Sequence, residues 1–103
     1  MKRPRIVEQI KAALHDCRPD AEVILFGSEA RGDARPDSDI DLLVLLPQLD
    51  VSYQEKDAIC TPLYEIEMHT GIPVNAHIHP HDYWDKRPLD YFKQNIQNEG
   101  IRL

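Results

Sequence analysis

The sequence predicts an α+β fold, a small mixed sheet of three or more strands flanked by helices. Three observations lead to this prediction. Apolar residues recur at helical spacing before residue 18 and again between residues 61 and 71. Two short apolar runs, Val23–Phe26 and Asp39–Leu46, are typical of strands, and Pro73–His79 alternates apolar with polar residues. The 103 residues, 42% of them hydrophobic, are enough for one small domain, which we expect to span residues 1–103.

Proline and glycine predict where the first helices begin and end. Pro4 suits the first turn of a helix, and Arg18–Asp20 ends that helix. Thr61 and Pro62 resemble an N-cap followed by proline at the first helical position. We therefore expect one short helix before Thr61 and a second that ends at Gly71. A single helix kinked at Pro62 is the alternative.

The lengths of the connections predict the topology. Only about a dozen residues join Val23–Phe26 to Asp39–Leu46, too few for a parallel crossover, so these strands should be antiparallel. A helical segment joins Asp39–Leu46 to Pro73–His79, which permits a parallel crossover. Pro88 should begin a final helix that Gly100 ends. The apolar side of that helix is expected to carry Leu89, Phe92 and Ile96.

Composition excludes several classes of function. The net charge is −6 and no long basic run is present, so we expect no direct nucleic-acid binding. No apolar stretch reaches membrane-spanning length, and the first ten residues lack the apolar core of a signal peptide. Cys17 and Cys60 form no CxxC motif and are expected to be reduced, packed thiols. These features predict a cytoplasmic protein.

Two aspartates open the second predicted strand in the run LFGSEARGDARPDSDIDLLVLL. Because side chains alternate along a strand, Asp39 and Asp41 should lie on the same face. Two carboxylates about 4 Å apart repel by about 1 kcal/mol in water and about 4 kcal/mol at an effective dielectric of 20. A divalent cation would offset this cost, and Mg²⁺ in particular prefers carboxylate, phosphate and water oxygens.

The residues before this strand are suited to phosphate. Gly27 lets the backbone approach a ligand closely, Ser28 offers a hydroxyl and an amide, and Arg31 can make charge-assisted contacts to phosphate oxygens. Taken alone, the aspartates could instead mark a solvated strand entrance, with Asp37 and Ser38 as turn residues. The whole pattern of strand, Gly-Ser, Arg-Gly, Ser-Asp-x-Asp and strand favours a phosphate and metal site.

At these residues the sequence resembles a known family. The segment GSEARGDARPDSDIDLLV is similar to the signature of the minimal nucleotidyltransferases (MNT) of the DNA polymerase β superfamily, and the closing FKQNIQNEGIRL extends the similarity over nearly the whole chain. The resemblance implies a polymerase-β-like fold. It also implies triphosphate binding at Gly27 and Ser28, metal binding at Asp39 and Asp41, and a supporting role for Arg31.

The resemblance also implies a reaction and a partner. Such proteins use Mg²⁺ to transfer a nucleoside monophosphate, usually AMP from ATP, with release of pyrophosphate. They are often antitoxins that are partnered with a small helical HEPN protein, and some adenylylate a tyrosine on it. An oligomer with such a partner is therefore expected.

The third carboxylate of the family is missing. By face and position its counterpart is Asn75, which shares a predicted strand face with His77 and His79. An asparagine is neutral and cannot act as a base, a role typically worth about 10²–10⁴ in rate. His77 lies two residues further on the same face and is a candidate substitute for the base.

The run HIHPH raises a separate hypothesis, a transition-metal site formed by His77, His79 and His81. Pro80 should turn His81 away, and no cysteine is near in the sequence. We therefore favour a polar rim beside the nucleotide pocket.

Three functions remain open on the sequence. The leading hypothesis is an active nucleotidyltransferase that modifies a partner protein. The alternative is an antitoxin subunit that binds nucleotide, has weakened catalysis and neutralises its partner by contact; Asn75 separates these two. A nucleotidyltransferase acting alone on small molecules is disfavoured, because nothing in 103 residues resembles an added acceptor-binding domain.

Overall fold

Four strands form one sheet in the order β3-β2-β1-β4 in the computed structural model, which describes all 103 residues. The strands are β1 (Glu22–Phe26), β2 (Ile40–Leu46), β3 (Val74–Pro80) and β4 (Ile101–Arg102). β1 pairs antiparallel with β2, and β2 pairs parallel with β3, as the connection lengths predict. The predicted mixed sheet is confirmed, and β4, which adds antiparallel to β1, is a strand that the sequence did not reveal.

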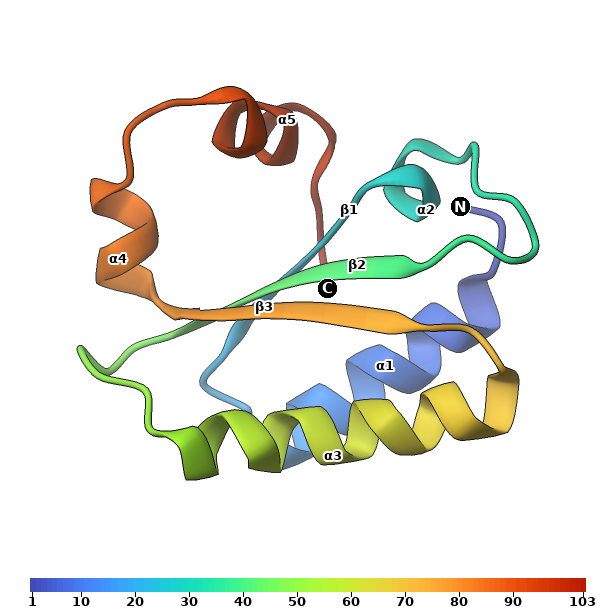
Figure 1. Ribbon diagram of the computed structural model, residues 1–103, viewed down its shortest axis with the longest axis horizontal. Helices are drawn as coiled ribbons and strands as arrows, with labels where there is room; N and C mark the ends of the chain where they lie inside the picture. The colour runs from blue at the N-terminus through green and yellow to red at the C-terminus, as the bar shows by residue number, and fades with distance from the viewer.

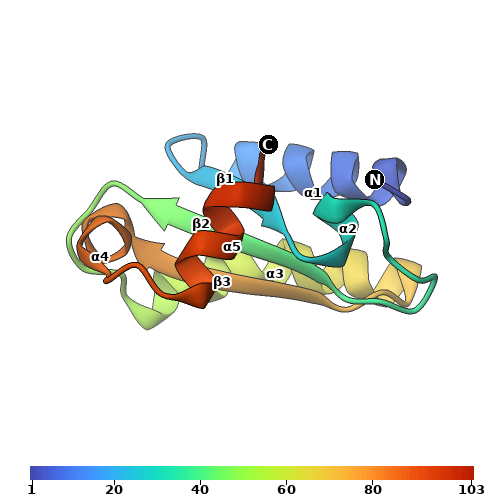
Figure 2. The same ribbon diagram turned by 90° about the horizontal axis from the view of Figure 1, so that it is seen from above.

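Helices cover both faces of this sheet. The helices are α1 (Pro4–Cys17), α2 (Ser28–Arg31), α3 (Tyr53–Thr70), α4 (His81–Lys86) and α5 (Tyr91–Glu99). α1 and α3 pack on one face, and α4 and α5 lie over the other (Figure 1; seen from above in Figure 2). None of the helices combines the length and the hydropathy that crossing a membrane requires.

The central strand β2 is buried on both sides. Ile40, Leu42 and Val44 pack into the main core with α1 and α3, whereas Leu43 and Leu45 pack with α4 and α5. Because neither face is left to solvent along this part of the strand, its sequence is apolar at every position after Asp41.

Pro62 lies inside a continuous helix, so the prediction of two helices is wrong. α3 runs unbroken from Tyr53 to Thr70, and its N-terminus is a capping box between Ser52 and Glu55 rather than the expected cap at Thr61. Proline in a helix interior costs about 3 kcal/mol. The apolar side chains on both sides of it each contribute about 1.5–3 kcal/mol when buried, which offsets that cost. These buried side chains are Ile59, Leu63 and Ile66.

The C-terminal region also differs from its prediction. The expected single helix from Pro88 is replaced by α4, which begins directly after β3, and by α5, which begins after Asp90. Asp90 is the N-cap, and its side chain accepts a hydrogen bond from the Lys93 amide. Leu89 therefore lies outside the helix and is 66% exposed, while Phe92 and Ile96 pack on the sheet as predicted.

Neither thiol is packed as the sequence predicts. Cys17 and Cys60 are both free and exposed. Partial burial nevertheless raises the pKa of each thiol, so neither is an activated nucleophile.

A buried carboxylate connects the N-terminus to α2. The Glu29 side chain is fully buried and accepts hydrogen bonds from the Lys2 amide (2.6 Å), the Arg3 amide (2.8 Å) and Arg3 Nε (2.6 Å). Arg3 Nη1 in turn donates to the Ser38 carbonyl oxygen, so the Arg3 guanidinium also fixes the loop before β2. Burial raises the pKa of Glu29, but these hydrogen bonds outweigh burial and hold the pKa below its ordinary value.

Glu29→Gln should lower the free energy of unfolding by about 3 kcal/mol near neutral pH, because it leaves the Arg3 charge largely buried without its partner. Since the folded-state pKa of Glu29 is lowered, the stabilisation is present above the unfolded pKa of about 4.3 and is lost as the pH falls through the folded value. Urea denaturation at several pH values measures this. The control is Glu8→Gln, which removes an exposed carboxylate from α1; equal losses in both variants would contradict the assignment.

Candidate active site

Asp39, Asp41 and Asn75 converge at one end of the sheet, as the alternation of side chains predicts. Asp41 is paired with Asn75 in the register of β2 and β3. Asn75 Nδ2 donates hydrogen bonds to Asp39 Oδ2 (3.0 Å) and to Asp41 Oδ1 (3.3 Å). The asparagine amide therefore bridges the two carboxylates and offsets part of their mutual repulsion.

These polar side chains remain open to solvent. Asp39 and Asn75 are exposed and Asp41 is half-buried, whereas Leu43 and Leu45, further along the same face of β2, are buried with α4 and α5. The change from polar to apolar residues along β2 thus marks where the helical cover of this face begins.

Gly27 forms the wall of the site opposite β3. Its backbone has φ +78° and ψ −158°, a region that is essentially restricted to glycine. A Cβ at this position would lie 2.6 Å from Asp41 Oδ2. The absence of a side chain therefore allows the Gly27 backbone to approach the Asp41 carboxylate directly. Ser28, the first residue of α2, follows at the same turn and is partly exposed.

Arg31 lies beside this turn and is paired with acidic residues. Its Nη1 donates to the Glu99 carboxylate at 3.0 and 3.2 Å, and its Nε donates to Asp33 at 3.3 Å. Hydrogen bonds to Glu99 and then to Asp33 raise the pKa of Arg31, which keeps its positive charge. Glu99 also accepts a hydrogen bond from the Gly27 amide at 3.3 Å. Sequence reasoning missed Glu99, because nothing local indicates that it contacts a turn 72 residues earlier.

His77 lies on the same sheet face but packs against aromatic rings. Its ring centroid is 5.7 Å from that of Phe26 and 5.6 Å from that of Phe92. It makes no hydrogen bond to Asp39 or Asp41. The structure therefore places His77 near the carboxylates along β3 without bringing it into their hydrogen-bond network.

The other two histidines lie far from the carboxylates, so the predicted histidine rim beside the pocket is wrong for them. His79 pairs with Leu45, about 13 Å along the strand from Asp41 at 3.3 Å per residue. It stacks on Tyr83 at 4.6 Å, and burial lowers its pKa. His81 begins α4, and hydrogen bonds to Glu22 and then to Asp85 raise its pKa.

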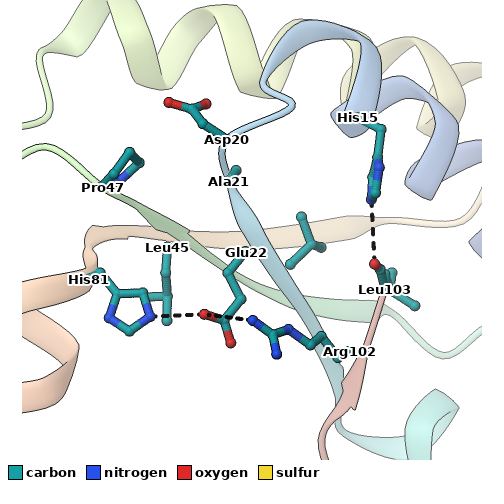
Figure 3. Close-up of a pocket in the computed structure, with 10 residues that line it drawn as sticks. His15, Asp20, Ala21, Glu22, Leu45, Pro47, His81, Arg102 and Leu103 are labelled. Atoms are coloured by element: carbon teal, nitrogen blue, oxygen red, sulfur yellow. Dashed lines mark hydrogen bonds and ion pairs between the residues drawn. The ribbon is translucent and has the colours of Figure 1, made fainter.

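His81 lines a surface hollow that is separate from the two aspartates. This hollow of about 450 Å³ contains both acidic and basic side chains, and Figure 3 shows Glu22 between His81 and Arg102. Glu22 is the first residue of β1, whereas Asp41 pairs with Phe26, the last residue of that strand. The hollow is therefore at the opposite end of the sheet from the carboxylates. No three His, Cys, Asp or Glu side chains anywhere in the chain form a metal-ligand group.

The donor set at the carboxylates fits one kind of metal. Asp39 and Asp41 supply carboxylate oxygens at an open position, and no nitrogen or sulfur ligand accompanies them. Mg²⁺ is usually held by one or two carboxylates while phosphate and water oxygens complete its coordination. The residues present are therefore compatible with Mg²⁺ bound together with a phosphate ligand, and not with a closed structural zinc site.

Comparison with known proteins identifies the family. Residues 7–103 match the model of the family described as "Nucleotidyltransferase domain". The chain belongs to this family. The nucleotidyltransferase domain is 34% identical over 79 residues to a "Putative protein adenylyltransferase" of Methanocaldococcus jannaschii, and the match covers 77% of this chain and 73% of that protein.

Solved structures share the fold of this nucleotidyltransferase domain. A structure described as a "putative minimal nucleotidyltransferase" is 26% identical, has a TM-score of 0.63, and is matched over 100% of this chain and 97% of its own. A crystal structure of a toxin–antitoxin with AMP-PNP has a TM-score of 0.65 at 19% identity, over 92% of this chain and 69% of that chain. At that identity the second likeness shows the fold alone.

Gly27→Ala should destabilise the domain by at least about 1 kcal/mol more than Gly71→Ala. Alanine at position 27 would have to adopt a backbone conformation that is essentially restricted to glycine, and its Cβ would also collide with Asp41. Gly71 is a matched control, since its φ is also positive (+74°) but a Cβ there would meet nothing within 4 Å. Urea denaturation compares the two variants. Equal destabilisation would show that Asp41 can move away without cost and that the close approach at Gly27 is not required.

Proposed function

We propose that this nucleotidyltransferase domain binds ATP with Mg²⁺ and transfers AMP to a hydroxyl group of a partner protein. The observation that carries the proposal is that Asn75 joins Asp39 and Asp41 at the point where the side-chain-free backbone of Gly27 approaches Asp41. We further propose that the partner is a small helical HEPN protein, for which the chain is the antitoxin. The name of the Methanocaldococcus jannaschii relative and the toxin–antitoxin structures of similar fold support this choice.

Each residue has a separate task in this proposal. Asp39 and Asp41 would hold Mg²⁺, which when bound neutralises phosphate charge and favours attack at phosphorus. The Gly27 amide, the Ser28 hydroxyl and Arg31 would donate hydrogen bonds to phosphate oxygens. Because positioning and charge stabilisation account for most of phosphoryl-transfer catalysis, these groups supply the main part of the rate enhancement.

The reaction exchanges one phosphorus–oxygen bond for another. The acceptor hydroxyl oxygen attacks the α-phosphorus of ATP and forms a new P–O bond. The bond from the α-phosphorus to the bridging oxygen breaks, and its electron pair leaves with pyrophosphate. The hydroxyl proton must be lost, and Asn75 cannot accept it. His77 contacts the rings of Phe26 and Phe92 and makes no hydrogen bond to Asp39 or Asp41, so we assign the proton to solvent water.

Asn75 supports a second candidate function. Its amide donates to both aspartates and thereby holds them together without a metal. A site of this kind can bind nucleotide yet turn over slowly. In the alternative, the domain is a nucleotide-binding antitoxin subunit that neutralises its partner by direct contact.

Binding of ATP should depend on both the metal and the aspartates. Isothermal titration calorimetry should detect ATP binding in the presence of Mg²⁺ and at least tenfold weaker binding without it, since the metal offsets the repulsion between the triphosphate and the carboxylates. Asp39→Ala/Asp41→Ala should weaken binding of ATP with Mg²⁺ by at least about tenfold, because it removes both proposed metal ligands. Asp37→Ala is the control, since it removes an exposed aspartate from the adjacent loop. Equal affinities in all three proteins would remove the metal site from the proposal.

Asn75→Asp should increase the rate of AMP transfer at least about tenfold, a cautious fraction of what a general base contributes. The assay follows label from α-³²P-ATP onto a HEPN partner protein. Wild type should transfer AMP slowly or undetectably, and Asp41→Asn should be inactive in both backgrounds. Rapid transfer by wild type that His77→Ala abolishes and Asn75→Asp leaves unchanged would instead make His77 the base.

A further inference from the structure

Glu99, the final residue of α5, places its carboxylate against the Gly-Ser turn. Glu99 Oε1 accepts a hydrogen bond from the Gly27 amide at 3.3 Å, and both carboxylate oxygens accept from Arg31 Nη1 at 3.0–3.2 Å. The Glu99 side chain is only 20% exposed. α2 and α5 lie on the same side of the sheet (Figure 1), and the Arg31–Glu99 contact links them.

The position of Glu99 is fixed by the residues that follow it. A Cβ at Gly100 would overlap the Ile96 carbonyl oxygen and would lie 2.7 Å from Ile24 Cγ2, so only glycine fits where α5 meets β1. The next residues form β4, which pairs with β1 through Ile24↔Arg102 and Leu25↔Ile101. The end of α5 is thus anchored to the strand that leads into Gly27, and a change in Glu99 would be confined to its side chain.

The groups that Glu99 holds are those that recognise anions. A backbone amide and a guanidinium donate to carboxylate and phosphate oxygens in the same way. A phosphate oxygen that bonded to the Gly27 amide would have to replace Glu99 Oε1 there. Until it did, three carboxylates, those of Asp39, Asp41 and Glu99, would face the incoming polyphosphate.

We propose that Glu99 is an internal competitor for the phosphate donors, a carboxylate that occupies Gly27 and Arg31 in the nucleotide-free domain and withdraws when a polyphosphate binds. This rests on the proposed function, which assigns those donors to the triphosphate. The competition acts on the part of ATP that leaves as pyrophosphate. Return of Glu99 to its donors then favours release of that product, and AMP alone does not displace it.

Glu99→Gln tests the proposal, because glutamine keeps a hydrogen-bond acceptor but removes the charge. Calorimetry with Mg²⁺ present should show that Glu99→Gln binds both ATP and pyrophosphate about tenfold more tightly than wild type, with AMP affinity unchanged. Glu8→Gln, which removes an exposed charge on α1, should remain within about twofold of wild type for every ligand. In the Arg31→Ala background, the gain from Glu99→Gln should shrink, because one of the two contested donors is gone.

Each alternative outcome has a definite meaning. Equal affinity of wild type and Glu99→Gln for ATP and pyrophosphate would overturn the competition. Weaker binding by Glu99→Gln, with a native circular dichroism spectrum, would also overturn it and would make Glu99 a positioning residue for Arg31. An equal gain in ATP and pyrophosphate affinity in Glu8→Gln would show that the effect comes from net charge alone, and would overturn the competition. Absence of ATP binding in all the proteins would overturn the proposed function itself, and with it this inference.

Discussion

Repulsion between two carboxylates on one strand face is the constraint on which this site depends. Asp39, directly before β2, and Asp41 are held together because β2 beyond Asp41 is buried on both faces and cannot rotate to separate them. The surrounding residues accommodate their charge. Asn75 bridges them with amide hydrogens, and Gly27 has no side chain to collide with Asp41. A stable core therefore maintains a local arrangement of like charges, which a bound cation would stabilise in the proposed function.

Charges are also paired at the Gly-Ser turn. In a chain of net charge −6, the basic groups near the site are already engaged, Arg31 with Glu99 and Asp33, and Arg3 with Glu29. The Arg3–Glu29 pair is buried and fixes the loop that precedes Asp39, so it acts on the shape of the site. The Arg31–Glu99 pair is partly exposed and lies at the turn, so a ligand can exchange with it.

Binding and catalysis place different demands on the third strand. In the proposed function, binding of a metal with a triphosphate uses Asp39, Asp41 and the Gly27 amide, and Glu99 accepts a hydrogen bond from that amide in this structure. Efficient proton removal needs a base, and Asn75, which the resemblance to minimal nucleotidyltransferases aligns with a carboxylate, cannot act as one. The membership of the chain in the nucleotidyltransferase family establishes its class, and in our proposal the rate of AMP transfer depends on Asn75.

The sequence by itself determined the parts of the protein that depend on local periodicity. The first three strands, their directions, α1, and the shared face of Asp39, Asp41 and Asn75 follow from alternation, helical spacing and connection length. Local signals failed where tertiary burial outweighed them. Pro62 predicted a break, but burial of Ile59, Leu63 and Ile66 keeps α3 continuous. Pro88 predicted a helix start, but Asp90 is the cap.

Only the tertiary structure decided the contacts between distant segments. Three contacts each join residues from separate elements: Glu99 with Gly27, Glu29 with Arg3, and His77 with the rings of Phe26 and Phe92. No periodicity encodes such contacts, because they depend on how α5 and the N-terminus dock on the finished sheet. The sequence determined which residues share a face, and the packing of the elements decided which of those residues meet.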